Sequence, residues 1–162
     1  MTTGSLGQGT SLAVGMALGD HLKGRNCRTF VIVGDGESNE GQVWEAAMFT
    51  AGKRITNLVW IIDDNKKQLD GPTEDVLPLF DLRAKFEAFG FEAVRVDGGD
   101  PEAIADALQV PATDRPRAVI LDNIKGRGVK DVEQTAANHS MNVTPETCDR
   151  WLEQLRAELA AL

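Results

Sequence analysis

Two short polar segments carry the residues whose types and spacing could support chemistry. The first, at positions 34–41, is G-D-G-E-S-N-E-G, and the second, at positions 63–67, is D-D-N-K-K. Each follows a short apolar, β-branched stretch that is typical of a buried strand. Asp35 and Asn65 would therefore lie at the carboxyl ends of parallel strands, roughly 5 Å apart if the strands are neighbours and roughly 10 Å apart if one strand lies between them.

A carboxylate and an amide oxygen are hard donors that suit Mg²⁺, which takes few protein ligands and fills its octahedron with phosphate oxygens and water. Glycines on both sides of Asp35 allow a phosphate to approach the backbone, and the N-terminus of the helix that follows favours an anion. G-D-G alone is equally typical of a tight turn. Combined with D-D-N, it favours a metal-bridged diphosphate site.

Nucleotide-binding motifs fit the first segment less well. In the dinucleotide fingerprint G-x-G-x-x-G, Asn39 would replace the third glycine, and Asp35 would repel a pyrophosphate that has no metal. The sequence also contains no G-x-x-x-x-G-K-[ST] segment, so a P-loop is excluded.

Alternating helix and strand patterns must position these residues. They predict an α/β fold, a parallel sheet flanked by helices, in which ligands bind beyond the carboxyl ends of the strands. The whole chain, residues 1–162, is expected to form one domain. Strands are predicted over 28–33, 57–62, 93–96 and 117–121, and helices over 11–23, 41–53, 79–89, 101–108 and 145–162, the last with Thr144 as N-cap.

Composition and charge exclude several classes of partner. Seventeen basic and 25 acidic residues give a net charge of −8 without a basic patch, so neither nucleic acid nor an anionic membrane is an expected partner. The longest apolar run, at positions 58–62, is far shorter than the roughly 20 residues of a membrane span. No signal peptide is visible, and two cysteines without a partner motif, Cys27 and Cys148, suit a cytoplasmic location. Helix 41–53 is apolar on more than one face, which predicts an oligomer.

The chain resembles the thiamine diphosphate-binding domain of a transketolase, and the resemblance covers nearly its whole length. The matching segments keep their order and mutual spacing, which is far more specific than any single tripeptide. They are T-T-G-S-L-G-Q-G (2–9), G-D-G-E-S-N-E-G-Q-V-W-E-A-A (34–47), D-D-N-K-K-Q-L-D-G (63–71), R-A-K-F-E-A-F-G-F (83–91) and K-G-R-G-V (125–129).

The resemblance implies a site residue by residue. Mg²⁺ would be held by the Asp35 carboxylate, the Asn65 side-chain oxygen and the main-chain carbonyl of Lys67, a position that is commonly aliphatic in the family. Gly36 would contact the diphosphate through its main chain. The segment that lies against the thiazolium ring would be Gly4, Ser5 and Leu6, with serine where the family often has proline.

Two further side chains have implied roles in catalysis. Glu40 matches the glutamate that joins a carboxylate network across the subunit interface, although a first-turn glutamate is also favoured by the helix dipole. His139 matches a histidine near the diphosphate and the substrate, but Ser140 follows it where the family has glycine, so a solvated loop histidine is the alternative. His21, at the polar end of a helix, is expected at the surface.

The implied reaction is the transfer of a two-carbon ketol unit between sugar phosphates. The family's segment upstream of Gly4 and its pyrimidine-binding domain have no counterpart here, so the domain is expected to be shortened at its N-terminus and to need a partner chain that carries the pyrimidine domain. Self-association is also expected. The alternatives are a non-catalytic remnant that only folds and associates, and another thiamine diphosphate enzyme such as 1-deoxyxylulose-phosphate synthase.

Overall fold

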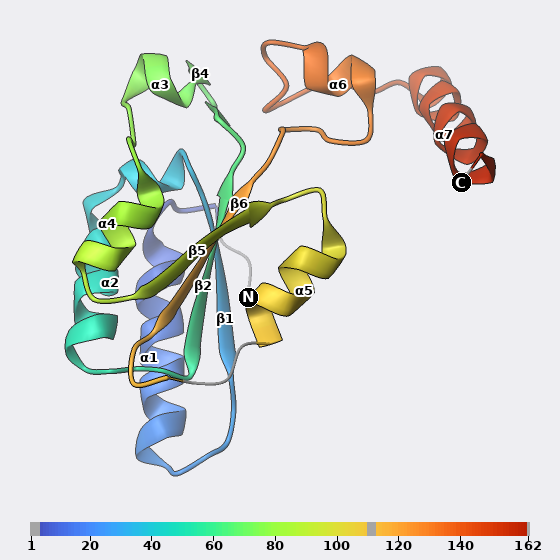
Figure 1. The fold of residues 1–162 in the computed structure, drawn as a ribbon. Coiled ribbons are helices and arrows are strands. Elements are labelled where there is room, and N and C mark those ends of the chain that lie inside the picture. The colour runs from blue at the N-terminus through green and yellow to red at the C-terminus, as the bar shows by residue number, and fades with distance from the viewer. Residues whose placement is uncertain (1–3, 110–112, 162) are drawn as a thin grey trace.

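Four parallel strands form the central sheet of the computed structural model, which describes residues 4–109 and 113–161 (Figure 1). Their order in the sheet is β1-β2-β6-β5, and every neighbouring pair is parallel. The predicted parallel α/β fold is therefore confirmed. The strands are β1 (Thr29–Gly34), β2 (Leu58–Asp64), β5 (Glu92–Asp97) and β6 (Arg117–Asp122).

All five predicted helices are present, with some boundaries moved. The predicted start at position 79 is wrong: α4 begins at Leu82 because the Asp81 side chain caps it by accepting a hydrogen bond from the Ala84 amide at 3.1 Å. Helix α1 begins earlier than predicted, after Gly7, whose φ of +79° suits glycine at the N-cap. The five are α1 (Gln8–Leu22), α2 (Gly41–Gly52), α4 (Leu82–Ala88), α5 (Pro101–Gln109) and α7 (Pro145–Ala160).

Several short elements were not predicted, and all of them lie beyond the carboxyl ends of the strands. They lie in the connections that follow β1, β2 and β6, where a few hydrogen bonds to distant residues decide the local conformation. These elements are the 3₁₀ turn η1 (Glu37–Asn39), the hairpin of β3 (Lys67–Gln68) and β4 (Gly71–Pro72), and the helices α3 (Thr73–Val76) and α6 (Lys130–Gln134).

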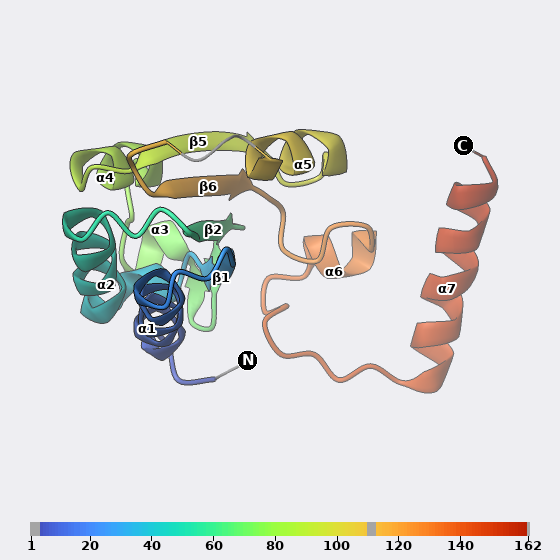
Figure 2. The same cartoon turned by 90° about the horizontal axis from the view of Figure 1, so that it is seen from below.

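The helices form two layers on the sheet. Figure 2 shows α1, α2 and α4 on one face and α5 on the other. The main core lies under the first layer, where Trp60, Phe86 and Phe91 are fully buried and their rings meet in tilted or edge-on contacts at 5.2 to 5.9 Å. This core fixes the strands, and therefore fixes the loops at their carboxyl ends.

Helix α7 stands apart from the sheet in Figure 2, and none of its residues from Pro145 to Ala160 is buried. Thr144 caps it as predicted, accepting a hydrogen bond from the Thr147 amide. The Asp131 carboxylate in α6 links α6 to α7 by accepting hydrogen bonds from Arg150 and from the Trp151 indole, each at 3.0 Å. The leucine stripe of α7 is at least partly exposed over Leu152, Leu155 and Leu159, and Leu162 lies outside the described residues.

Surface features agree with the sequence where they can be compared. His21 is exposed as expected, and both cysteines are exposed and unpaired. Within residues 4–109 and 113–161, no helix combines the length and apolar character that a membrane crossing requires.

Candidate functional site

The two polar segments meet at the carboxyl edge of the sheet. β1 and β2 are direct neighbours, and the pairing continues past the strand ends, where the Asp35 amide donates to the Asp63 carbonyl at 3.1 Å. Of the two arrangements considered from the sequence, the structure therefore has the one in which the two strands are neighbours, with no strand between them.

Asp35 is only 2% exposed although it lies in a loop. One carboxylate oxygen accepts from the Gly36 amide at 2.7 Å and the other from the Thr73 hydroxyl at 3.1 Å. Burial raises the pKa of Asp35 above its ordinary value, and these hydrogen bonds oppose that rise without cancelling it. A buried carboxylate that finds no cationic partner at hydrogen-bond distance among the described residues is costly, so a cation at this position would stabilise it.

Gly36 is needed for a reason that the sequence does not reveal. A Cβ at this position would lie 2.7 Å from the Cβ of Gln68 in the β3–β4 hairpin. Gln68 in turn donates to the Asn39 side chain at 3.2 Å, which closes the hairpin over the G-D-G turn. At Gly34, by contrast, a Cβ would have no neighbour within 4 Å among the described residues, so open space remains beside this part of the backbone.

The Asn65 amide is oriented by its neighbours. Its Nδ2 donates to the Asp63 carboxylate at 2.9 Å, and the same carboxylate accepts from Asn123 after β6, also at 2.9 Å. The Asn65 Oδ1 therefore points the other way, where it accepts from the Lys67 amide at 3.1 Å. This fixes Oδ1 as the atom that could act as a ligand.

Between these two predicted ligands, Lys66 adopts a left-handed backbone with φ of +67°. Its ammonium group forms ion pairs with Asp64 and Asp122, the latter at 3.2 Å. Asp64 is also paired with Arg95 at 2.7 Å. The ion pairs hold a conformation that a lysine backbone does not favour.

Replacing Lys66 with glycine is therefore expected to cost less stability than replacing it with alanine. Both changes remove the ammonium group, but only glycine relieves the left-handed strain, so the glycine variant should be more stable by about 1 kcal/mol. Urea unfolding of both variants measures this difference. At Lys85, inside α4, the alanine variant should instead be more stable than the glycine variant. If the alanine and glycine variants of Lys66 were equally stable, the backbone at Lys66 would not be strained.

Lys125 is a site residue that the sequence reasoning did not single out. Its Nζ lies 3.3 Å from the Lys67 carbonyl oxygen and 2.7 Å from Nδ1 of His139. Burial lowers the pKa of Lys125, while attraction to Asp35 and Asp63 opposes the shift. The available signal was its position at the head of K-G-R-G-V, directly after a strand. An ammonium group thus already lies on the carbonyl predicted to bind a metal ion.

The loop that carries His139 is tied back onto the same site. The Lys67 ammonium donates to the carbonyls of Glu133 and Thr135 at 3.2 and 3.0 Å. Asn138, which is buried, donates to the carbonyls of Lys125 and Val132 at 3.2 and 2.8 Å. His139 is exposed beside this anchored loop, with its ring nitrogen against Lys125.

The glycine-rich N-terminal segment is fixed through Glu37, a second residue that the sequence reasoning missed. One Glu37 oxygen accepts from the Gly7 amide at 2.8 Å and the other from the Gly34 amide at 3.4 Å. Gly4, Ser5 and Leu6 therefore lead into α1 beside the G-D-G turn, and Leu6 is exposed; Thr2 and Thr3 lie outside the described residues.

Glu40 precedes α2, and its side chain is exposed. It forms no hydrogen bond that caps α2, nor any ion pair within the described residues. The same part of the chain contains no cluster of three or more His, Cys, Asp or Glu side chains that could hold a metal. A metal would therefore rely on the mixed set of carboxylate, amide and carbonyl oxygens, a donor chemistry that suits Mg²⁺ with substrate phosphates.

A parallel sheet with oxygen donors and a lysine gathered beyond its carboxyl edge is the arrangement of an α/β domain that binds a phosphorylated ligand. The model of the family "Transketolase, thiamine diphosphate binding domain" matches residues 1–157. The chain therefore belongs to the transketolase family and corresponds to its N-terminal, thiamine diphosphate-binding domain.

Similar proteins include single subunits of transketolases. A 6-deoxy-6-sulfo-D-fructose transketolase subunit of Clostridium sp. (strain MSTE9) is 43% identical over 98% of this chain and 58% of its own length. An apulose-4-phosphate transketolase subunit of Actinobacillus succinogenes is 36% identical over 98% of this chain and 58% of its own length. This chain thus spans a little over half the length of these relatives.

A solved structure supports the same fold. Transketolase from Campylobacter jejuni superimposes with a TM-score of 0.86 at 27% identity, covering 94% of this chain and 25% of that enzyme.

Proposed function

We propose that this chain, acting as one domain, supplies the thiamine diphosphate- and Mg²⁺-binding part of a two-subunit transketolase that transfers a two-carbon ketol unit between sugar phosphates. The observation that carries the proposal is the meeting of the buried Asp35 carboxylate, the oriented Asn65 amide and the Lys67 carbonyl with the Lys125 ammonium group. Relatives described as transketolase subunits support the involvement of a second chain.

The residues present fit a metal ion and a diphosphate. Asp35, Asn65 Oδ1 and the Lys67 carbonyl would hold Mg²⁺, and the ammonium group already on that carbonyl supports its affinity for a cation. Open space at Gly34 leaves room for phosphate oxygens beside the turn, while at Gly36 the side of the backbone that a Cβ would occupy is covered by Gln68.

Thiamine diphosphate, when bound, supplies the nucleophilic carbon that makes and breaks carbon–carbon bonds. The chain's own residues place it and balance its charge. Gly4, Ser5 and Leu6 would lie against the thiazolium ring, and Lys125 would neutralise phosphate charge. His139, with Nδ1 against Lys125, keeps Nε2 available for a substrate oxygen. The exposed Glu40 carboxylate would face a carboxylate network of the partner.

The outer faces of α1 and α2 are the surface we assign to subunit contact. The two helices lie side by side, linked by hydrogen bonds from Gln42 to Ser11 and from Gln8 to Gln42. Their outward faces carry exposed apolar side chains that a partner could cover. These are Leu12, Met16, Met48 and Phe49, which are 40 to 58% exposed.

Replacing Met48 with aspartate is expected to prevent association while leaving the fold intact. The side chain is 58% exposed, so the charge costs little in the free chain but would be buried without a partner in an interface. Sedimentation velocity, with the chain alone and with the partner subunit, measures the effect. Leu159→Asp on α7 is the control, and an unchanged assembly in the Met48 variant would count against this surface.

The proposed function is tested in two steps. Calorimetry with thiamine diphosphate and Mg²⁺ should show binding by the chain together with a pyrimidine-domain subunit, and ketol transfer between sugar phosphates should require both chains. Absence of binding even with the partner would favour a domain that only folds and associates. Activity with pyruvate and glyceraldehyde phosphate, but not with ketose phosphates, would favour a 1-deoxyxylulose-phosphate synthase.

The two unpaired, exposed cysteines support the further proposal of a cytoplasmic location.

A further inference from the structure

A polar cavity of about 420 Å³ lies at the end of the sheet opposite the proposed cofactor site. Arg28 directly precedes β1, Asn57 precedes β2, and Glu92 and Arg117 begin β5 and β6. Strands of six or seven residues separate the two ends of the sheet by about 20 Å. The cavity is therefore distinct from the site around Asp35, and its volume falls within the range of small-molecule sites.

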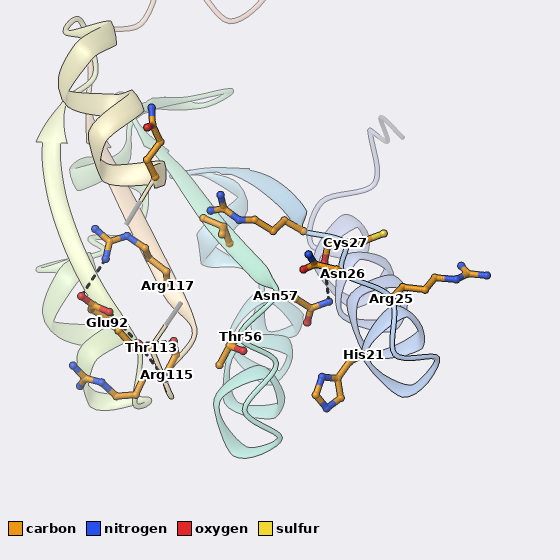
Figure 3. A pocket seen from close by; sticks show the side chains of 13 residues that line it. His21, Arg25, Asn26, Cys27, Thr56, Asn57, Glu92, Thr113, Arg115 and Arg117 are labelled. Atoms are coloured by element: carbon orange, nitrogen blue, oxygen red, sulfur yellow. Dashed lines mark hydrogen bonds and ion pairs between the residues drawn. The ribbon is translucent and has the colours of Figure 1, made fainter. Parts of the chain in front are cut away.

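Figure 3 shows how the walls are arranged. Arg117, Glu92 and Thr113 lie on one side and Asn57 and His21 on the other, with Thr56 between them. The exposed side chains of Arg25 and Arg115 extend outward from the rim. The cavity is thus lined by hydroxyl, amide, imidazole and guanidinium groups together with the Glu92 carboxylate.

The charge of this cavity is opposite to that of the chain. Four arginines line it against one carboxylate, Glu92, although the net charge of the chain is −8. Arg117 is paired with Glu92 at 3.1 Å and Arg25 with Asp20 at 3.2 Å. Arg28 and Arg115 have no carboxylate partner within residues 4–109 and 113–161. The cavity therefore carries an uncompensated positive charge.

Helix α5 explains the placement of two of these arginines, and of the two only Arg28 keeps its charge available, since Arg117 is paired with Glu92. Arg28 donates to the Leu108 carbonyl at 2.6 Å and Arg117 to the Ala107 carbonyl at 2.7 Å, in the last turn of the helix. Such contacts are favourable at a helix C-terminus. Arg28 uses one of its five N–H donors in this way, and a carbonyl does not neutralise its charge. Arg115 plays no part in this cap.

We propose that this cavity binds the dianionic phosphate group of a small phosphorylated metabolite. Guanidinium groups bind phosphate oxygens bidentately, and two arginines without a carboxylate partner balance a dianionic phosphate better than a monoanionic carboxylate. Arg28 would be the principal ligand, and Arg115, an exposed side chain at the rim, would turn inward to join it. The Thr56 hydroxyl would bind a hydroxyl group on the remainder of the ligand, whereas the Thr113 hydroxyl is already bonded to Glu92 and to the Arg115 backbone.

The test is calorimetric titration of the chain with inorganic phosphate and with glycerol 3-phosphate at constant ionic strength. Arg28→Gln and Arg115→Gln should each weaken binding about tenfold, since each removes a charge-assisted hydrogen bond. Because Arg115 is exposed at the rim, its variant should fold and remains informative if Arg28→Gln unfolds. Arg83→Gln on α4, whose side chain pairs with Glu87 instead, is the matched control and should bind normally.

The same titration separates this cavity from the proposed cofactor site. Binding that survives Lys125→Met and Asp35→Asn but not Arg115→Gln supports the proposal, and does so whether or not the chain binds thiamine diphosphate. Binding lost with Lys125→Met and retained in both arginine variants would place the phosphate at the cofactor site and overturn it. No heat with either ligand would overturn it as well. Tighter binding of glycerol 3-phosphate than of inorganic phosphate would show that the organic part is also recognised.

Discussion

Replacement of Asp35 by asparagine is expected to abolish Mg²⁺-dependent binding of thiamine diphosphate and, at the same time, to stabilise the unliganded chain at neutral pH. The change keeps the size of the side chain and an oxygen that can accept the Gly36 amide hydrogen bond, but it removes the charge that a metal needs. Loss of a group that only supports a metal ligand weakens metal affinity about 10- to 100-fold. Loss of the ligand carboxylate itself should therefore weaken Mg²⁺ affinity by more than about 100-fold.

The stability gain follows from the raised pKa of Asp35. Because the pKa is higher in the folded chain than in the unfolded chain, folding takes up protons between the two values, and the ionised carboxylate opposes folding at any higher pH. Asparagine removes that cost. The gain should therefore be present at pH 7, shrink as the pH falls through the folded pKa, and vanish below the unfolded one. Each kcal/mol recovered raises the Tm by about 2 to 4 °C for a chain of this size.

Thermal unfolding between pH 3 and 8, together with calorimetry of the cofactor, measures both effects. Asp70→Asn, an exposed aspartate in the β3–β4 hairpin, is the control and should change neither. If the Asp35 variant bound cofactor and metal with normal affinity, the proposed metal site would be wrong. If it lost binding and was also less stable at pH 7, burial of the charge would not be the dominant effect.

Replacement of Lys125 by methionine is expected to weaken thiamine diphosphate binding about 10- to 100-fold while affecting thiamine itself much less. The Nζ lies between the Lys67 carbonyl and His139, in the field of Asp35 and Asp63, where it would compensate diphosphate charge. A charge-assisted hydrogen bond to phosphate is worth about 1.5 to 3 kcal/mol, which corresponds to that change in affinity. Methionine keeps the apolar stem of the side chain.

Comparing thiamine diphosphate, thiamine monophosphate and thiamine separates the charge effect from general damage to the loop. The loss should grow with the number of phosphate groups. Lys130→Met, on the first residue of α6, is the matched control and should bind all three as the unmodified chain does. Equal losses for all three ligands would mean that Lys125 supports the loop around His139 rather than the phosphate charge.

The sheet could be predicted because its determinants are local. Apolar runs such as 58–62 are short and rich in β-branched residues, which favours a buried strand over a buried helix, and the intervening helices favour parallel connections. The Thr144 cap was predictable for the same reason, since it depends on residues three positions away. The start of α4 was missed because the apolar residues Leu79 and Phe80 extend the helical pattern toward the N-terminus. In the structure the helix begins only after Asp81, which caps its N-terminus.

The sequence by itself determined which chemical groups this protein brings to one edge of its sheet: the acid and glycines of the first segment and the acids, amide and lysines of the second. Motif order and strand spacing are encoded along the chain, so the family and the fold followed from them. Only the tertiary structure decided how those groups are held. Gln68 packs over Gly36, Glu37 bridges Gly7 and Gly34, and Lys125 lies on the Lys67 carbonyl. Contacts such as Glu37 to Gly7 and Lys125 to Lys67 join residues 30 and 58 positions apart, and no periodicity or propensity records which distant side chains will meet.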